Sequence, residues 1–96
     1  MTFKNQREMF IWIWETRPHI SEVSGDPLLP PTEFKWHWQF AHILPKGTYS
    51  KFRLNPNNVM LMTPEEHAHQ EDHKAYHTKK EILRAEYRNL YEIKKL

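Results

Sequence analysis

Residues 56–67 read PNNVMLMTPEEH, and this short stretch contains a complete strand-to-helix transition. The run 59–62 is wholly apolar and is preceded by proline and asparagines, which is typical of a short buried strand. Thr63 is followed by Pro64 at the first helical position and by Glu66 at the third, a pattern that forms a capping box. The stretch therefore predicts a buried strand that passes directly into a helix.

The predicted helix is long, and a second helix is expected at the other end of the chain. No glycine or proline follows Pro64, so the C-terminal helix is expected to span residues 64–95. Apolar residues recur at helical spacing near the N-terminus, which predicts a helix over residues 2–15 with Thr2 as its N-cap. The Arg17-Pro18 pair should end that helix, because a residue before proline avoids the helical conformation.

Two further extended segments are expected between the helices. Residues 20–28 indicate a short strand and a tight turn at Gly25-Asp26. Residues 34–44 alternate aromatic and polar side chains with period two, which predicts the longest strand of the protein. Strands between two terminal helices indicate an α+β fold.

Length and composition limit the possible functions. Ninety-six residues make a single domain, residues 1–96. The chain has no cysteine, which excludes disulfides and cysteine-ligated zinc. The longest apolar run, residues 9–14, is far too short to cross a bilayer, so no membrane partner is expected and the cytoplasm is the expected location. Seven histidines are many for this length, and they are the main candidates for chemistry.

Positive charge is concentrated in the middle of the chain. Residues 34–64 contain no Asp or Glu but four cations, Lys35, Lys46, Lys51 and Arg53. A cationic stretch without acids attracts phosphate groups, although a chance gap in the acidic residues gives the same pattern. Lys46, Lys51 and Arg53 follow His42 in the sequence and are candidate phosphate contacts, with Arg53 suited to bidentate contact.

Three residues combine into a possible catalytic site. His42 lies at the end of one predicted strand, Asn58 at the start of the next, and His67 in the following helix. A neutral imidazole can take a proton from water near pH 7. A second imidazole can hold a divalent ion that stabilises a departing oxyanion, and an amide can orient the base or the ion.

These residues and their surroundings resemble the HNH endonuclease family. The resemblance is carried by residues 40–47, Arg53, residues 56–63 and Glu66-His67, within a core over residues 20–72. It implies a ββα-metal core flanked by an N-terminal helix (residues 1–17) and the long C-terminal helix. It also implies that His42 is the general base, that Asn58 is the motif asparagine, and that His67, nine residues later, is a metal ligand.

The chain departs from the family pattern at two places. Many members of that family hold a structural zinc with two cysteine pairs, whereas this chain has Ser21, Ser24, Thr63 and Glu66 at these positions. The resemblance therefore implies a zinc-free branch, in which the capping box and the flanking helices stabilise the fold in place of zinc. Many relatives also carry a metal ligand directly before the base, where this chain has Ala41. Glu71, four residues after His67 on the expected helix, could replace it, or it is a surface glutamate.

The remaining histidines are expected to be peripheral. His69, His73 and His77 follow one another at i, i+4 and i+8, a spacing that suits metal chelation but is also found on solvated helix faces. The solvated face is the favoured interpretation. His37 is expected on a strand surface, and His19 has no partner visible in the sequence.

The sequence thus predicts a metal-dependent DNA endonuclease of low sequence specificity that nicks or cuts double-stranded DNA. Its cofactor would be a divalent ion, Mg²⁺ or Mn²⁺, with Ni²⁺ and Zn²⁺ as alternatives. The resemblance points to a phage or mobile-element protein that works in the host cytoplasm, as a homodimer or with a packaging partner. The alternatives are an inactive DNA- or protein-binding module of the same fold, such as a phage inhibitor, and a structural or assembly protein.

Overall fold

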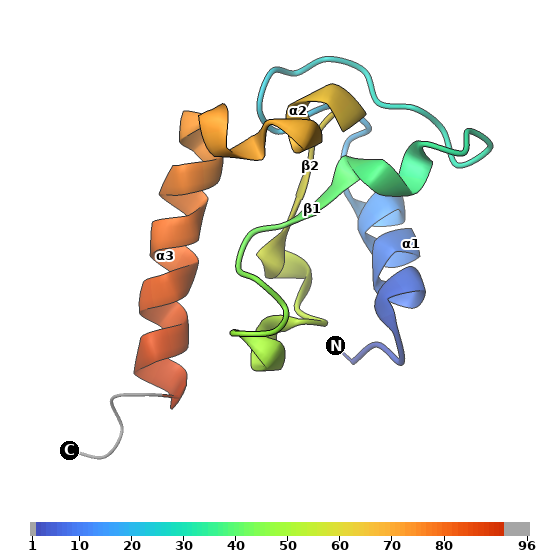
Figure 1. Cartoon of the computed structure of the whole chain (residues 1–96). Coiled ribbons are helices and arrows are strands. Elements are labelled where there is room, and N and C mark those ends of the chain that lie inside the picture. The colour runs from blue at the N-terminus through green and yellow to red at the C-terminus, as the bar shows by residue number, and fades with distance from the viewer. Residues whose placement is uncertain (1, 92–96) are drawn as a thin grey trace.

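The computed structural model describes residues 2–91. Within them the chain forms a small α+β fold with three α-helices and one two-stranded antiparallel sheet (Figure 1). The elements are α1 (Gln6–Thr16), β1 (Phe40–His42), β2 (Val59–Leu61), α2 (Pro64–Ala68) and α3 (Lys74–Tyr91). Four 3₁₀ turns connect them, at Trp36–Gln39, Ser50–Phe52, Pro56–Asn58 and Gln70–Asp72.

The hairpin of β1 and β2 lies between α1 and α3, so both of its faces are covered (Figure 1). The strands pair with Phe40 opposite Leu61 and His42 opposite Val59. Alternate side chains point to opposite faces of a strand. Accordingly Phe40, Val59 and Leu61 pack in one core cluster with α1, whereas Ala41, Met60 and Met62 pack in another with α3. This burial on both faces explains why residues 59–62 are continuously apolar, as the sequence predicts for a buried strand.

The N-terminal helix starts later than expected. Asn5, and not Thr2, is its N-cap, because the Asn5 side chain accepts a hydrogen bond from the Glu8 N–H at 2.8 Å. The Glu8 carboxylate in turn accepts from the Lys4 N–H at 3.1 Å, which uses a second free donor at the helix start. The predicted end is confirmed, since the helix stops at Thr16, immediately before Arg17-Pro18.

The long aromatic strand predicted over residues 34–44 is wrong for most of its length. Only Phe40–His42 is a strand, and Trp36–Gln39 forms a 3₁₀ turn. The buried Gln39 amide stabilises this turn, because it donates to the Trp36 carbonyl and exchanges two hydrogen bonds with the Leu29 backbone. The aromatic residues contact one another four apart along the chain, with ring centroids 4.8 Å apart for Trp36 and Phe40. Aromatic residues at every second position are also present at every fourth position. Residues four apart lie close together in a helical turn, so the alternation is compatible with a turn as well as with a strand.

The segment 20–28 contributes a turn and a single bridge in place of a strand. Ile20 and Pro27 form an isolated antiparallel bridge. The turn predicted at Gly25-Asp26 lies slightly earlier, at residues 22–24, and the Gly25 N–H closes it by donating to the Ser21 carbonyl at 2.9 Å. Gly25 has a φ of +82°, a conformation that favours glycine.

The continuous C-terminal helix predicted over residues 64–95 is also wrong. Helix α2 ends at Ala68, and α3 begins at Lys74 after a 3₁₀ turn; residues 92–95 lie outside the described part. Two imidazoles bond to carbonyls beside the break, with His73 Nε2 donating to the Glu66 carbonyl at 3.1 Å and His77 Nε2 to the Glu71 carbonyl at 2.6 Å. The break lets α2 cross one end of the hairpin while α3 runs along its side (Figure 1). No helix within residues 2–91 is long and apolar enough to span a bilayer.

Candidate active site

A groove of about 810 Å³ lies between α1 and the segment that leads into β1. Aromatic side chains form most of its walls: Phe10, Trp14, Phe34, Trp36, Trp38 and Phe40. His42 and His67 line the same groove, although they come from β1 and α2. The structure thus brings together the two histidines that the sequence singles out for chemistry.

His42 is held in an apolar setting on the α1 side of the hairpin. Its ring centroid lies 6.0 Å from that of Phe10. Its Nε2 is buried and has no hydrogen-bond partner among residues 2–91. Burial lowers the pKa of His42 below 6.5, the nearby charges of Lys46 and His67 lower it further, and a hydrogen bond to the Arg53 backbone opposes them. His42 is therefore neutral at pH 7, the protonation state that a general base requires.

His67 is oriented by a backbone carbonyl. The capping box predicted at the start of α2 is confirmed, with Thr63 and Glu66 bonding to each other's backbone N–H groups, and it fixes the helix turn that carries His67. The Nδ1 of His67 lies 2.6 Å from the Trp38 carbonyl oxygen. A carbonyl only accepts, so Nδ1 carries the proton and the lone pair lies on Nε2. Metal-binding histidines are commonly oriented in this way.

Asn58 supports the site without lining the groove. Its fully buried amide accepts from the Leu44 N–H at 2.7 Å and donates to the Leu44 carbonyl at 3.1 Å. Its own carbonyl accepts from the Ile43 N–H at 2.9 Å. The side chain thus ties together the two ends of the loop that follows His42. Asn58 makes no hydrogen bond to His42 or His67 within the described residues, so it holds the position of His42 indirectly, through the backbone.

Glu71 does not share a helix face with His67, because α2 ends between them. Its carboxylate lies 3.7 Å from His77 Nε2. The same break removes the helical stripe expected for His69, His73 and His77. Within residues 2–91 there is no group of three or more His, Cys, Asp or Glu side chains placed to hold an ion.

Of the three predicted phosphate contacts, Lys46 lies beside the groove without lining it. Its ammonium donates to the side-chain amide oxygen (Oε1) of Gln6 at 3.3 Å, and Gln6 lines the groove. Lys51 instead lies 5.1 Å from the centre of the Tyr91 ring. Arg53 has an exposed side chain, while its backbone bonds to His42.

Ser21, Ser24, Thr63 and Glu66, the four positions where zinc-binding members of the resembled family have cysteines, form one polar cluster. The Ser21 hydroxyl donates to the Glu66 carboxylate at 2.6 Å, and the same carboxylate oxygen accepts from the Thr63 N–H at 2.9 Å. Burial alone would raise the pKa of Glu66, but hydrogen bonds from Ser21, Ser24 and Thr63 outweigh burial and lower it. Direct hydrogen bonds therefore link the turn after residue 20 to the start of α2.

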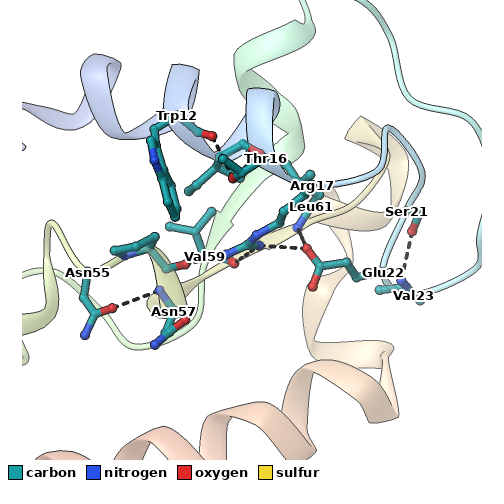
Figure 2. Close-up of polar contacts among 12 residues, drawn as sticks. Trp12, Thr16, Arg17, Ser21, Glu22, Val23, Asn55, Asn57, Val59 and Leu61 are labelled. Atoms are coloured by element: carbon teal, nitrogen blue, oxygen red, sulfur yellow. Dashed lines mark hydrogen bonds and ion pairs between the residues drawn. The ribbon is translucent and has the colours of Figure 1, made fainter. Parts of the chain in front are cut away.

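A hydrogen-bond network around the half-buried Arg17 was not predicted from the sequence. The guanidinium donates to the carbonyls of Val59 and Pro56, each at 2.7 Å, and pairs with Glu22 at 2.8 Å (Figure 2). The Glu22 carboxylate also accepts from the Leu61 N–H at 2.9 Å. Arg17 thereby connects the end of α1 to β2. The Arg17-Pro18 pair signals only the helix end, because both carbonyl partners lie about forty residues further along the chain.

The comparisons with known proteins add no assignment: no protein-family model, curated protein or solved structure matches the chain.

Proposed function

We propose that this protein is a metal-dependent DNA endonuclease with a ββα-metal core of the HNH type, formed by β1, β2 and α2. The observation that carries the proposal is His42, a neutral imidazole whose buried Nε2 has no hydrogen-bond partner among residues 2–91. Unpartnered buried polar atoms are costly, and they are concentrated at functional sites. A second imidazole, that of His67, lines the same groove with its Nε2 lone pair free.

His42 would act as the general base. Its Nε2 takes a proton from water, the water oxygen forms a bond to phosphorus, and the bond from phosphorus to the 3′ oxygen breaks. Nε2 is covered in this structure, so an approaching substrate has to displace a lining side chain before the proton can move; Phe10 is a neighbouring ring. Lys46, close enough to lower the pKa of His42, would contact the phosphate.

His67 fits the role of ligand to a divalent ion. The Trp38 carbonyl holds its Nδ1–H and leaves Nε2 available. The ion, Mg²⁺ or Mn²⁺ with Ni²⁺ and Zn²⁺ as alternatives, would supply positive charge to the leaving oxygen. Glu71 remains a proposed second ligand to the ion, although it does not lie on the same helix face as His67. Magnesium usually keeps several waters and binds phosphate oxygens, so one imidazole suffices only for weak binding.

A plasmid assay tests the proposal. Supercoiled plasmid is incubated with the protein and Mg²⁺, Mn²⁺, Ni²⁺ or EDTA, and nicked and linear products are measured. We expect ion-dependent nicking that His42→Ala reduces by about 100-fold or more. His69→Ala is the matched control, since that imidazole is exposed and lies outside the groove. Absence of cleavage with every ion, for a folded protein at high concentration, contradicts the proposal.

Calorimetry tests the metal site separately. His67→Ala should abolish binding of Mn²⁺ or Ni²⁺, whereas His69→Ala should leave it unchanged. Binding that survives His67→Ala would place the ion elsewhere.

The second candidate function is an inactive DNA- or protein-binding module of the same fold. Ala41 favours it, because this residue is fully buried on the α3 side of the hairpin and offers no ligand. DNA binding that falls steeply with salt, without cleavage by any ion, would support this function over the enzyme.

A further inference from the structure

We infer that the aromatic groove beside His42 and His67 takes an unpaired nucleobase of the DNA, so that the preferred substrate is single-stranded or carries a displaced base. This inference rests on the proposed function, because it assigns the substrate class of the same site. Its observations are the exposed aromatic walls, the distribution of charge along the groove and an unused hydrogen-bond donor.

Two aromatic side chains at the groove are left open to solvent. Phe34 is 73% exposed and Trp38 is 44% exposed, with their ring centroids 5.7 Å apart at an interplanar angle of 81°. Lys35 places its ammonium 6.0 Å and 5.8 Å from the two ring centres. Exposing large aromatic faces to water is unfavourable, whereas each face can stack on any of the bases. An adjacent cation adds attraction for the phosphate backbone.

Charge along the groove matches the two ends of a nucleotide. Arg7 and Lys46, the latter through Gln6, supply positive charge near the start of α1, on the side of the proposed phosphate. Glu15 lies eight residues after Arg7, which is about 12 Å along the helix, and Glu33 also lines the groove. Carboxylates repel phosphate but accept hydrogen bonds from the exocyclic amino groups of bases. The groove therefore offers cations for phosphate and carboxylates for a base.

The indole N–H of Trp36 strengthens the assignment. Trp36 lines the groove, and its Nε1 is buried without a hydrogen-bond partner in the described part of the chain. An indole N–H can only donate. A base carbonyl or ring nitrogen is a suitable acceptor, and Nε1 is the second orphaned polar atom in this groove after His42 Nε2.

The size of the groove indicates that it takes a single unpaired nucleotide and not a base pair. About 810 Å³ is within the range of small-molecule pockets and accommodates one nucleotide. A base inside a duplex cannot reach the aromatic walls, so it must first leave the stack, which costs least in a single strand or at a mismatch.

The test is binding in EDTA, where cleavage does not interfere. The probes are a short fluorescent single strand, the same strand with every base replaced by an abasic sugar analogue, and the matching duplex. The two single strands carry the same backbone, so a difference between their affinities reports contacts to bases. We expect the base-containing strand to bind the wild-type protein roughly 5- to 100-fold more tightly than the abasic strand.

Exposed side chains allow variants that leave the core intact. Phe34→Ala and Trp38→Ala should each remove most of that preference, while Ile82→Ala, an exposed apolar residue on α3 outside the groove, should retain it. Equal affinity for the two single strands overturns the inference. Binding of a proline-rich peptide at the groove, together with binding of none of the DNA probes, also overturns it. Base preference without plasmid nicking supports the groove and contradicts only the enzyme. Plasmid nicking without base preference contradicts only the groove.

Discussion

At the scale of single residues, the site depends on how individual imidazoles are bonded. His19, His67, His73 and His77 all lie within hydrogen-bond distance of backbone carbonyls through a ring nitrogen. His42 also has a hydrogen bond to the backbone, at Arg53, but it differs in that its other nitrogen, Nε2, is buried without a partner among residues 2–91. The abundance of histidine in the sequence therefore reflects mainly structural roles, and the exception is the residue proposed as the base.

The titration of His42 provides a prediction with a definite sign. Its pKa is lowered from 6.5, mainly by burial, so the folded protein keeps it neutral at pH values where an exposed histidine is already charged. Below pH 6.5 the unfolded chain takes up the proton first, and this group therefore destabilises the folded state as the pH falls. NMR titration of the imidazole should give a midpoint below 6.5, and the acid limb of nicking activity should lie at that midpoint. A midpoint above 6.5 would contradict the structure.

Asn58 gives a second prediction at this scale. Asn58→Ala would leave the buried N–H and carbonyl of Leu44 without their partner, which should lower the free energy of unfolding by about 2–4 kcal/mol. Urea denaturation measures the change. Asn57→Ala is the control, since that side chain is exposed and makes no hydrogen bond within residues 2–91, and it should change stability by less than about 0.5 kcal/mol. Equal effects of the two variants would show that Asn58 does not hold the loop.

At the scale of elements, the polar cluster of Ser21, Ser24, Thr63 and Glu66 connects the turn after residue 20 to α2. The folded pKa of Glu66 is below its usual 4.5, so its contribution to stability is present above pH 4.5 and is lost as the pH falls through the folded pKa. Hydrogen bonds of the cluster thus make the connection that a structural zinc makes in many members of the family that the sequence resembles.

Ser21→Ala tests this connection. We expect the variant to lose about 1–2 kcal/mol of unfolding free energy at pH 7, because Ser21 no longer donates to the Glu66 carboxylate. The loss should shrink at pH values where Glu66 is protonated, and the pKa of Glu66 should rise. Ser50→Ala, an exposed serine in the loop, is the control. A loss that is independent of pH would assign the effect to packing and not to the carboxylate.

At the scale of the whole molecule, two helices cover opposite faces of a sheet with only two strands. A two-stranded hairpin is marginal alone, so its stability depends on packing against α1 and α3. Leu83, Tyr76 and Tyr87 are buried from α3, and the Tyr76 hydroxyl donates to the Ile43 carbonyl at 3.2 Å. The position of His42 therefore depends on a helix that contributes no residue to the groove.

Leu83→Ala tests that dependence. Leu83 is 2% exposed, and its truncation should lower the free energy of unfolding by about 2–5 kcal/mol in urea denaturation. Ile82→Ala, next in sequence but 63% exposed, should be nearly neutral. Similar costs for both variants would contradict the packing of α3 on the hairpin.

Much of the local structure could be predicted from the sequence. The apolar run of β2, the capping box at Thr63, the helix end at Arg17-Pro18 and the turn at Gly25 all follow from short-range rules, because the interactions that form them lie within a few residues. The pairing of His42 with His67 as candidates also came from the sequence, through spacing and resemblance.

The errors occurred where side chains bond to backbone groups that the short sequence patterns do not show. Gln39 stabilises a turn by bonding to Leu29, ten residues before it, while His73 and His77 bond to the carbonyls of Glu66 and Glu71, seven and six residues before them, at the break between α2 and α3. The alternation of residues 34–44 and the lack of glycine or proline after Pro64 favoured the strand and the continuous helix, and neither pattern reveals these partners.

The sequence by itself determined the strand β2, the capping box at Thr63 and the residue types available for chemistry, because these depend on side-chain character and near neighbours. Only the tertiary structure decided that His42 Nε2 is buried without a partner among residues 2–91 and that Asn58 holds a loop. The physical reason is that burial and hydrogen-bond partnership depend on segments far apart in the chain, which no local pattern specifies.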